Sequence, residues 1–310
     1  MPKPDQADDS VATGVMWMCG SLASFIGMAI ASRELSANLS TFQILFFRSV
    51  VGLVVIAALL PRLWPEMRLH RNIGLNFLRN CIHFGAQYCW TLGVALLPLA
   101  EVFALEFTMP VWVAIFAFLI LGERITAPKL IAIGVSFLGV LVILRPGVEV
   151  LDPASFIVLI AAAGYGMSAV LVKLLTRTNS AGVIVAWMIL MQLPMGAALA
   201  VTDWRPVVIG NLPWILLAGL TGLSAHYTMA RALKLLDASV AIPIDFLRMP
   251  LIALIGYLLY GETVSAWLAL GVAMILASNY YALRAESRRA RKQTPSTESA
   301  GLRPSTRPNQ

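Results

Sequence analysis

Charged residues are scarce in this sequence. Only 13% of its 310 residues are Asp, Glu, Lys or Arg, whereas 59% are hydrophobic and the mean hydropathy is +0.79. A water-soluble protein of this size has no means of burying so much apolar surface, so the long apolar stretches are interpreted as transmembrane segments. Open sheets would leave backbone groups unpaired in lipid, and the stretches are too long for barrel strands. The composition therefore predicts an all-α integral membrane protein.

Side chains typical of metal and redox chemistry are also few. The three cysteines, Cys19, Cys81 and Cys89, lie inside apolar stretches and form no CxxC pair, which indicates packing residues rather than a disulfide framework. The sequence contains neither an HExxH motif nor a P-loop, which argues against an intramembrane metalloprotease and a nucleotide-driven pump. No cofactor is expected. The acidic start MPKPDQADDS is unlike a signal peptide, so we expect the first helix to act as an uncleaved insertion signal.

The apolar stretches predict ten transmembrane helices. They are expected at residues 13–32, 42–60, 74–97, 101–121, 128–145, 154–175, 182–201, 212–234, 239–260 and 264–283. Residues 1–12 are expected to form a cytoplasmic tail. Residues 285–310 are basic and then rich in Ser, Thr and Pro, which predicts a disordered cytoplasmic tail.

Lys and Arg are distributed unevenly over this topology. With both termini in the cytoplasm, 17 of the 23 basic residues lie in cytoplasmic segments and only Arg33, Arg145 and Arg205 lie outside. The positive-inside rule therefore predicts cytoplasmic termini. Because the net charge of +7 is explained by this topology, we expect the lipid bilayer and no nucleic acid as a partner.

Two parts of the chain resemble each other at an offset of 139 residues. Glu123 and Glu262 each follow a glycine, and Glu106 aligns with Asp245. Upstream, Gln87 and Tyr88 align with His226 and Tyr227. Five helices per half is an odd number, so the second half must insert upside down relative to the first. Inverted repeats are typical of secondary transporters, which bind substrate near the midplane between the halves.

Several motifs, in their order and spacing, resemble the EamA type of the drug/metabolite transporter superfamily. They are Arg33 at the end of the first helix, FFR (Phe46 to Arg48), LPLAEVFALEFTMPVW (Leu97 to Trp112), LGERI (Leu121 to Ile125), GVSFLGVLVILRPG (Gly134 to Gly147), and Gly261 with Glu262. The resemblance covers residues 11–284. It implies ten helices in two inverted five-helix repeats, residues 13–147 and 148–284, that move metabolites by alternating access. FFR and AIPIDFLRMPLIALIGYLLYGE look more like the bacterial S-adenosylmethionine-uptake and riboflavin-uptake members than the amino-acid exporters.

Ionisable residues inside the spans are candidates for substrate binding and coupling, because a charge in a bilayer is costly and faces a cavity or a partner. Counting residues along the spans places Glu106 and Asp245 on opposite sides of the midplane, about 10–15 Å apart in depth. An ion pair between Glu106 and Arg48 is the alternative. Asp245 and Arg248 share a helix face. They either neutralise each other or hold a zwitterion, with its carboxylate on Arg248 and its amine on Asp245 or Glu106.

Further candidates lie on the third and eighth spans. Arg79 and His83 are four residues apart and share a helix face. His83 and His226 are candidates for gating a proton step, and a hydrogen-bonded structural role is the alternative. Aromatic side chains could stack on a ring or a cation, or simply pack. The candidate substrate residues are Glu106, Asp245, Arg248, Gln87, Tyr88, His226, Tyr227, Arg79, His83, Trp187 and Phe107, with Glu106, Asp245 and Arg48 proposed for coupling or gating.

We therefore predict a secondary transporter, not an enzyme, for a small polar or amphoteric organic metabolite such as S-adenosylmethionine or an amino-acid-like compound. The alternatives are uptake of riboflavin or another aromatic metabolite, and export of metabolites or drugs. Outside transport, the rivals are an intramembrane enzyme and a scaffold. A monomer and a homodimer are both open.

Overall fold

The computed structural model describes residues 4–68, 72–145, 152–236, 241 and 244–293, and their regular secondary structure is entirely helical. The first half contains α1 (Pro4–Ser36), α2 (Thr41–Ala57), α3 (Leu60–Met67), α4 (Ile73–Leu96), α5 (Leu99–Glu106), α6 (Met109–Leu121) and α7 (Ala127–Leu144). The second half contains α8 (Pro153–Leu175), α9 (Ala181–Ala200), η1 (Val201–Asp203), η2 (Ile209–Asn211), α10 (Leu212–Leu235), α12 (Arg248–Tyr260) and α13 (Ala266–Gln293). The predicted all-α class is confirmed for these residues.

Helices of the two halves recur at the spacing seen in the sequence. The starts of α4 and α10, Ile73 and Leu212, are 139 residues apart, and so are the starts of α7 and α13, Ala127 and Ala266. The start of α6 has the same relation to Arg248, the first residue of α12. The repeat in the sequence is therefore also a repeat in structure.

The turn after α6 and the turn after α12 are built alike. Gly122 (φ 67°) and Gly261 (φ 64°) both adopt the left-handed conformation, which ends a helix without strain only at glycine. The following residue then donates its backbone N–H into the helix, Glu123 to Ala117 O at 3.2 Å and Glu262 to Gly256 O at 3.1 Å. The glycine before each glutamate is therefore explained by backbone geometry.

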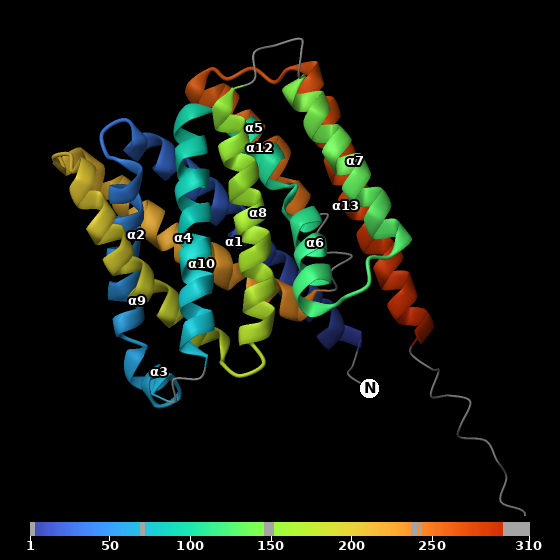
Figure 1. The fold of residues 1–310 in the computed structure, drawn as a ribbon, viewed down its shortest axis with the longest axis horizontal. Coiled ribbons are helices and arrows are strands. Elements are labelled where there is room, and N and C mark those ends of the chain that lie inside the picture. Colours follow the sequence, from blue (N-terminus) through green and yellow to red (C-terminus); the bar gives the residue numbers. More distant parts are fainter. Residues whose placement is uncertain (1–3, 69–71, 146–151, 237–240, 242–243, 294–310) are drawn as a thin grey trace, which may run out of the picture.

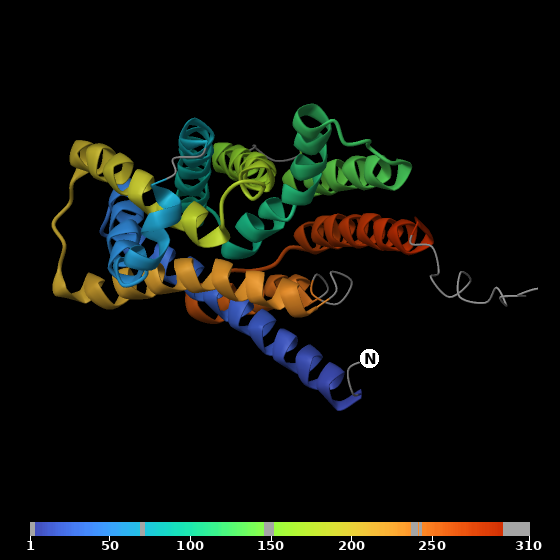
Figure 2. The same ribbon diagram turned by 90° about the horizontal axis from the view of Figure 1, so that it is seen from below.

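The two halves interlock. α4 packs against α8, α1 against α10, and α2 against α9, and each of these contacts joins one half to the other. α7 and α13 lie side by side and run in opposite directions (Figures 1 and 2). The α6–α7 turn and the α12–α13 turn lie toward opposite ends of the molecule (Figure 1). Opposite directions of equivalent helices are what an inverted repeat requires.

α7 and α13 approach each other most closely at two glycines. A Cβ atom on Gly139 would lie 2.9 Å from Gly271 O, and one on Gly271 would lie 2.6 Å from Gly139 O. One turn before Gly139 and two turns after Gly271, the hydroxyls of Ser136 and Ser278 share a hydrogen bond of 2.7 Å. Small residues and a buried hydroxyl pair are typical of tight helix packing inside membranes.

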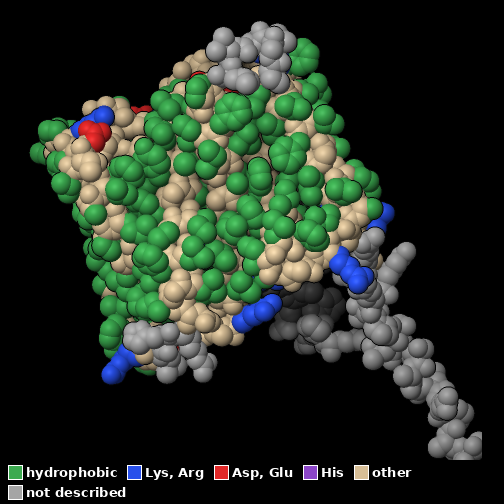
Figure 3. Space-filling view, viewed as in Figure 1, with side chains coloured by type: hydrophobic (Ala, Val, Ile, Leu, Met, Phe, Trp, Pro, Cys, Tyr) green, Lys and Arg blue, Asp and Glu red, His purple; other side chains and the backbone are tan. Residues whose placement is uncertain are grey.

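Six helical stretches are long and apolar enough to span a membrane, or seven if α2 and α3, which meet at 93°, form one span. Described helices overlap each of the ten predicted spans, with α5 and α6 together in the fourth, and the count of ten transmembrane helices stays a prediction. Three helices fall short: α12 because it has 13 described residues, and α4 and α10 because they carry several polar side chains. Figure 3 shows one broad apolar face with Lys and Arg at its edges, as expected for a surface in contact with lipid.

Parts of the predicted tails are helical. α1 starts at Pro4, within the segment expected to be a cytoplasmic tail, because proline and acidic residues are favourable in a first helical turn. α13 continues to Gln293, so the expected disordered tail is wrong for residues 285–293. That segment, AESRRARKQ, is rich in the strong helix formers Ala, Arg, Lys and Gln. Residues 1–3 and 294–310 lie outside the described part of the chain.

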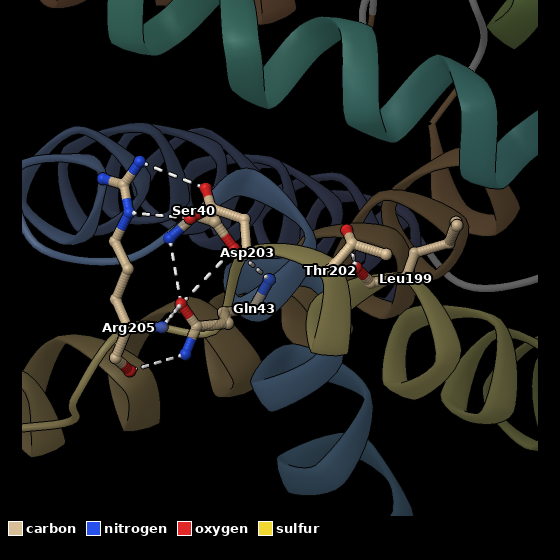
Figure 4. Close-up of polar contacts among 6 residues, drawn as sticks. All are labelled: Ser40, Gln43, Leu199, Thr202, Asp203 and Arg205. Carbon is tan, nitrogen blue, oxygen red and sulfur yellow. Dashed lines mark hydrogen bonds and ion pairs between the residues drawn. The ribbon is translucent and has the colours of Figure 1, made fainter.

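The start of α2 is tied to the segment that follows α9 (Figure 4). The Oε1 atom of Gln43 accepts backbone N–H bonds from Ser40 at 3.1 Å and Arg205 at 3.0 Å. Its Nε2 atom donates to Arg205 O at 2.8 Å. Gln43 is fully buried, and a buried amide is stable only when its donors and acceptors are paired in this way. These hydrogen bonds therefore connect the first half to the second where α2 begins.

Candidate substrate site

Arg248 is the centre of a buried ionic cluster in which two carboxylates bind one guanidinium. Its side chain is 7% exposed. Nη1 donates to Glu106 Oε1 at 3.4 Å, and Nη2 donates to Asp245 Oδ2 at 3.3 Å. Glu106 ends α5, Asp245 lies in the helical turn 244–246, and Arg248 begins α12. The cluster therefore forms where two spans are interrupted.

Prolines account for these interruptions. Pro110 is the second residue of α6 and Pro250 the third of α12, so neither offers an N–H to a preceding turn. Pro243, which precedes Asp245 in sequence, lies outside the described residues. Interrupted spans that carry charged residues are typical of transporter binding sites.

Three phenylalanine rings surround the guanidinium. The Cζ atom of Arg248 lies 4.5 Å from the ring centroid of Phe25, 4.8 Å from that of Phe107 and 5.3 Å from that of Phe103. A cation is attracted to the faces of aromatic rings, most strongly where water is excluded. The predicted site residue Phe107 is therefore beside the charged cluster, together with two rings that the sequence analysis did not select.

Glu106 has a second partner in Trp90. The indole Nε1 donates to Glu106 Oε2 at 2.7 Å, so one carboxylate oxygen binds Trp90 and the other binds Arg248. The alternative of a Glu106–Arg48 ion pair is therefore wrong for the structure described. Trp90 is 2% exposed. The sequence analysis did not find this hydrogen bond, since a lone tryptophan gives no sign of the direction of its N–H.

The predicted separation of Glu106 and Asp245 in depth is wrong. Both bind the same guanidinium, so they cannot be separated by the predicted depth of about 10–15 Å. The depth count treated each span as one straight helix, whereas α5 ends at Glu106 and the described part of α12 begins at Arg248. Breaks in both spans bring the two carboxylates to one place.

The cluster has unused capacity for a ligand. Arg248 Nε and Asp245 Oδ1 are buried and have no hydrogen-bond partner among the described residues. Buried polar atoms are nearly always paired in stable structures. Two carboxylates around one guanidinium also have a formal charge of −1, which favours a cationic or hydrogen-donating group nearby.

A second group of predicted residues lies around His83 and His226. His83 is 4% exposed, and its Nδ1 lies 3.0 Å from Gln192 Nε2. Its ring packs edge-on against Tyr165, with centroids 5.5 Å apart. His226 packs edge-on against Phe25, with centroids 5.7 Å apart. Because Phe25 also covers Arg248, His226 lies next to the ionic cluster.

Gln192 and Tyr165 were missed by the sequence analysis. The offset of 139 relates them to Leu53 and Ile26, which are apolar, so the repeat gave no signal for either residue. Neither lies in a motif. Only their placement on α9 and α8, opposite α4, brings them to His83.

Three predicted residues do not join the ionic cluster. Tyr227 is 58% exposed and packs edge-on against Trp17. Trp187 packs in a cluster of apolar side chains that includes Ile56 and Met67. Tyr88 stacks on Phe42, with ring centroids 4.4 Å apart. For these three the alternative of packing describes the contacts in the structure.

Ion pairs between the halves lie beyond the central site, at the turns after α6 and α12. Arg33 Nη2 lies 2.5 Å from Glu262 Oε1, and Glu262 Oε2 accepts the backbone N–H of Leu99 at 2.8 Å. Lys173 Nζ lies 2.5 Å from Glu123 Oε1. Glu262 is the repeat equivalent of Glu123, and Lys173 follows the equivalent of Arg33 by one residue. Each half thus supplies the cation that binds the other half's glutamate.

Interlocked halves of opposite direction, with charged residues at interrupted helices between them, define the architecture of a secondary transporter. The chain belongs to the EamA-like transporter family, which matches residues 12–145 and 153–284. It is accordingly a membrane protein that transports small metabolites.

Known proteins of this kind are similar along most of the chain. A riboflavin transporter of Rhizobium johnstonii is 32% identical over 204 residues, covering 66% of this chain and 68% of the relative. A riboflavin transporter of Vibrio cholerae is 26% identical and covers 90% of this chain and 96% of the relative. An S-adenosylmethionine uptake transporter of Rickettsia bellii is 20% identical and covers 89% and 94%. A solved crystal structure with 17% identity covers 91% of this chain and 99% of its own, with a TM-score of 0.56, which supports the fold.

Proposed function

We propose that the protein takes up a small polar or amphoteric metabolite that carries a planar ring, by alternating access between its two halves. The observation that supports this most directly is the Arg248 cluster, where charged groups and three phenylalanine rings meet at interrupted helices. Riboflavin and S-adenosylmethionine, the compounds named for the relatives, both join a planar heterocycle to polar groups. An enzymatic activity is not part of the proposal.

Riboflavin is the first candidate because the relatives with the higher identities are riboflavin transporters. Its uncharged ring system would stack on Phe25, Phe103 or Phe107, and its hydroxyls and ring nitrogens would bind the unpaired Arg248 Nε and Asp245 Oδ1.

S-adenosylmethionine is the second candidate, favoured by the formal charge of −1 at the cluster. Its sulfonium and amine are cations, and they would be attracted to Glu106 and Asp245 and to the aromatic faces nearby. S-adenosylmethionine agrees with the predicted amphoteric substrate. Its carboxylate would have to compete with Glu106 and Asp245 for Arg248, which already binds both.

The proposed topology has ten spans in a bacterial inner membrane, with both termini in the cytoplasm. The distribution of Lys and Arg supports it, as does the structure, in which the start of α1 and the end of α13 lie toward the same side (Figure 1). The Arg33–Glu262 pair then faces the periplasm and the Glu123–Lys173 pair faces the cytoplasm. All side chains of the site come from one chain, so the proposed transport does not require a homodimer.

Uptake of radiolabelled riboflavin and S-adenosylmethionine into membrane vesicles that contain the protein tests this function. We expect one of the two compounds to accumulate above the level in empty vesicles. Glu106→Gln should lower that uptake by roughly tenfold, a loss of about 1.4 kcal/mol, because the variant removes a charge from the site but keeps the Arg248–Asp245 pair. Tyr227→Phe, on the exposed face, is the matched control and should transport normally.

Failure to accumulate either compound would contradict the proposed substrate class. Unchanged uptake by Glu106→Gln, in protein shown by gel filtration to be folded, would move the site away from the Arg248 cluster.

A further inference from the structure

Gln87 is a polar side chain in the middle of α4 that has no hydrogen-bond partner among the described residues. The residue is only 7% exposed, yet neither of its amide atoms is sealed from water. The other buried glutamines of the described chain, Gln43 and Gln192, both have polar partners. Because buried amides are nearly always paired, the free amide of Gln87 needs a functional explanation.

Helix geometry gives the direction in which Gln87 points. Leu78 lies nine residues before Gln87 and Leu96 nine residues after it, which is two and a half turns in each case. Both leucines are exposed on the outside of the molecule, so Gln87 points the opposite way, into the bundle. Inside the bundle, α4 packs against α1 of its own half and against α8 and α9 of the other half. The amide therefore lies between the halves, where a transporter of this architecture binds its substrate.

The neighbours of Gln87 on this face of α4 belong to the candidate substrate site. His83, four residues before it, contacts α8 and α9. Trp90, three residues after it, packs edge-on against Phe103, with ring centroids 6.0 Å apart, and Phe103 is one of the three rings around Arg248. Residues three or four apart on a helix have Cβ atoms about 5–6 Å apart. Gln87 therefore lies one turn from the side chain that joins α4 to the Arg248 cluster.

We propose that the Gln87 amide binds the hydrogen-bonding edge of the heterocycle in the transported metabolite. A primary amide presents an acceptor oxygen and a donor nitrogen side by side. The rings of both candidate substrates carry a complementary edge. Riboflavin has its N3–H next to the C4 carbonyl oxygen, and the adenine of S-adenosylmethionine has its 6-amino group next to N7, a pair of atoms that glutamine amides bind in protein–DNA complexes.

The inference rests on the proposed function and makes it more specific. Stacking on phenylalanine rings selects any flat ring, because every heterocycle has a π-face. A two-pronged hydrogen bond selects only rings with a donor and an acceptor on neighbouring atoms, since an analogue that lacks one of them leaves the amide unpaired. Gln87 is therefore a residue that determines specificity for the ring, whereas the Arg248 cluster binds its face.

Riboflavin and 3-methylriboflavin test the assignment in detergent-purified protein. Binding is followed by the change in flavin fluorescence, and the methyl group of the analogue replaces the N3 hydrogen. We expect Gln87→Leu, of similar volume but without polar atoms, to bind riboflavin about tenfold more weakly than the wild type does. Methylation should weaken binding to the wild type by about tenfold and binding to Gln87→Leu by less than about twofold, because that variant has already lost the bond.

S-adenosylmethionine is tested in the same way against its N6,N6-dimethyl analogue, with calorimetry as the readout. Methylation of the 6-amino group removes its donors, as methylation of N3 does in the flavin. We expect the same two ratios between the wild type and Gln87→Leu for whichever compound the wild type binds.

Thr91→Val is the matched control. Thr91 lies on the same face of α4 one turn further on, and its hydroxyl has no partner among the described residues but is sealed from water. This variant should bind both members of each pair as the wild type does. Gln87→Asn keeps an amide on a shorter side chain and should retain part of the preference for the unmethylated compound.

The melting temperature separates a structural role of Gln87 from the proposed one. Gln87→Leu should melt no lower than the wild type without ligand, because the leucine removes a buried amide that has no partner among the described residues. A clear fall in its melting temperature, with unchanged affinity for the ligand, would overturn the proposal in favour of a structural role.

Three binding results decide the remaining cases. Equal affinity of the wild type and Gln87→Leu for the unmethylated compound would overturn the role of Gln87 and leave the proposed function intact. Equal effects of methylation on the two proteins would do the same, since the methyl group would then act away from position 87. Binding of neither riboflavin nor S-adenosylmethionine by the wild type would instead contradict the proposed function, and this inference with it.

Discussion

Arg33 binds Glu262 across the boundary between the two halves, 229 residues further along the chain. The side chains are 19% and 14% exposed. Arg33 Nη2 also donates to Leu97 O at 2.7 Å. The equivalent pair at the other end, Lys173 and Glu123, is 58% and 36% exposed. Equivalent ion pairs therefore join the two halves at opposite ends of the molecule, and the Arg33–Glu262 pair is the more buried one. This difference is expected for a state in which the halves are closely packed at the Arg33–Glu262 end only.

Removal of the Glu262 charge should destabilise the protein more than removal of the Glu123 charge. Glu262→Gln leaves Arg33 largely buried without its anion, and loss of one partner of a buried pair costs up to about 3–5 kcal/mol. Glu123→Gln breaks a solvent-exposed pair, which contributes about 0.2–1 kcal/mol. Thermal melts of both variants in the same detergent check the order. Equal melting temperatures would show that burial does not set the strength of these pairs.

The Glu123–Lys173 pair should make stability depend on pH only in the acid range. The hydrogen bond from Lys173 lowers the pKa of Glu123. A lowered carboxyl pKa stabilises the folded state above the unfolded-state value and loses this effect as the pH falls through the folded-state value. The difference in melting temperature between wild type and Glu123→Gln should therefore be constant from about pH 7 to pH 5 and shrink below about pH 4. Lys173→Gln should show the same profile, and a difference that grows on acidification contradicts the assignment.

Loss of Arg248 should be the most damaging single change in the central site. Arg248→Gln leaves both Glu106 and Asp245 without their cation, whereas Glu106→Gln leaves one ion pair intact. We expect Arg248→Gln to cost more than about 3 kcal/mol and to lower the yield of folded protein. Adding Glu106→Gln and Asp245→Asn to Arg248→Gln should restore part of the loss, since no charge remains unpaired. A triple variant less stable than Arg248→Gln would show that the guanidinium does not stabilise these acids.

Gly271→Ala should disrupt the contact between α7 and α13. The added Cβ would lie 2.6 Å from Gly139 O and 2.5 Å from Ile143 Cγ1, too close for packing without helix movement. We expect a loss of about 1–3 kcal/mol, typical of overpacking. Gly134→Ala is the control because no atom lies within 4 Å of a Cβ there. It should be neutral or stabilising by up to about 1 kcal/mol. Equal melting temperatures for the two variants would refute the close approach.

Much of the fold was predictable because its signals are local or repeated. Apolar runs located the helices, and the glycines before Glu123 and Glu262 marked equivalent turns. The pair of Asp245 with Arg248 also followed from a spacing of three residues. The predicted boundaries of the first and last helices were wrong, because polar segments with high helix propensity were interpreted as tails.

The partners in the central site were less predictable because they are distant in sequence. Glu106 and Arg248 are 142 residues apart, and the carboxylate was first placed by counting along an unbroken helix. Its bond to Trp90 depends on the direction of one indole N–H. Gln192 and Tyr165 had no signal at all, since neither belongs to a motif or recurs in the repeat. Such contacts are set by which helices face each other.

Through the two ion pairs, each half of this single chain depends on the other half, as the subunits of an obligate dimer do. Glu123 of the first half is neutralised by Lys173 of the second, and Glu262 of the second by Arg33 of the first. If the halves were produced as separate polypeptides, each would carry one carboxylate and one cation without a counter-ion. Their association would pair all four charges. Complementary charge thus favours the inverted assembly of the halves independently of the connection between α7 and α8.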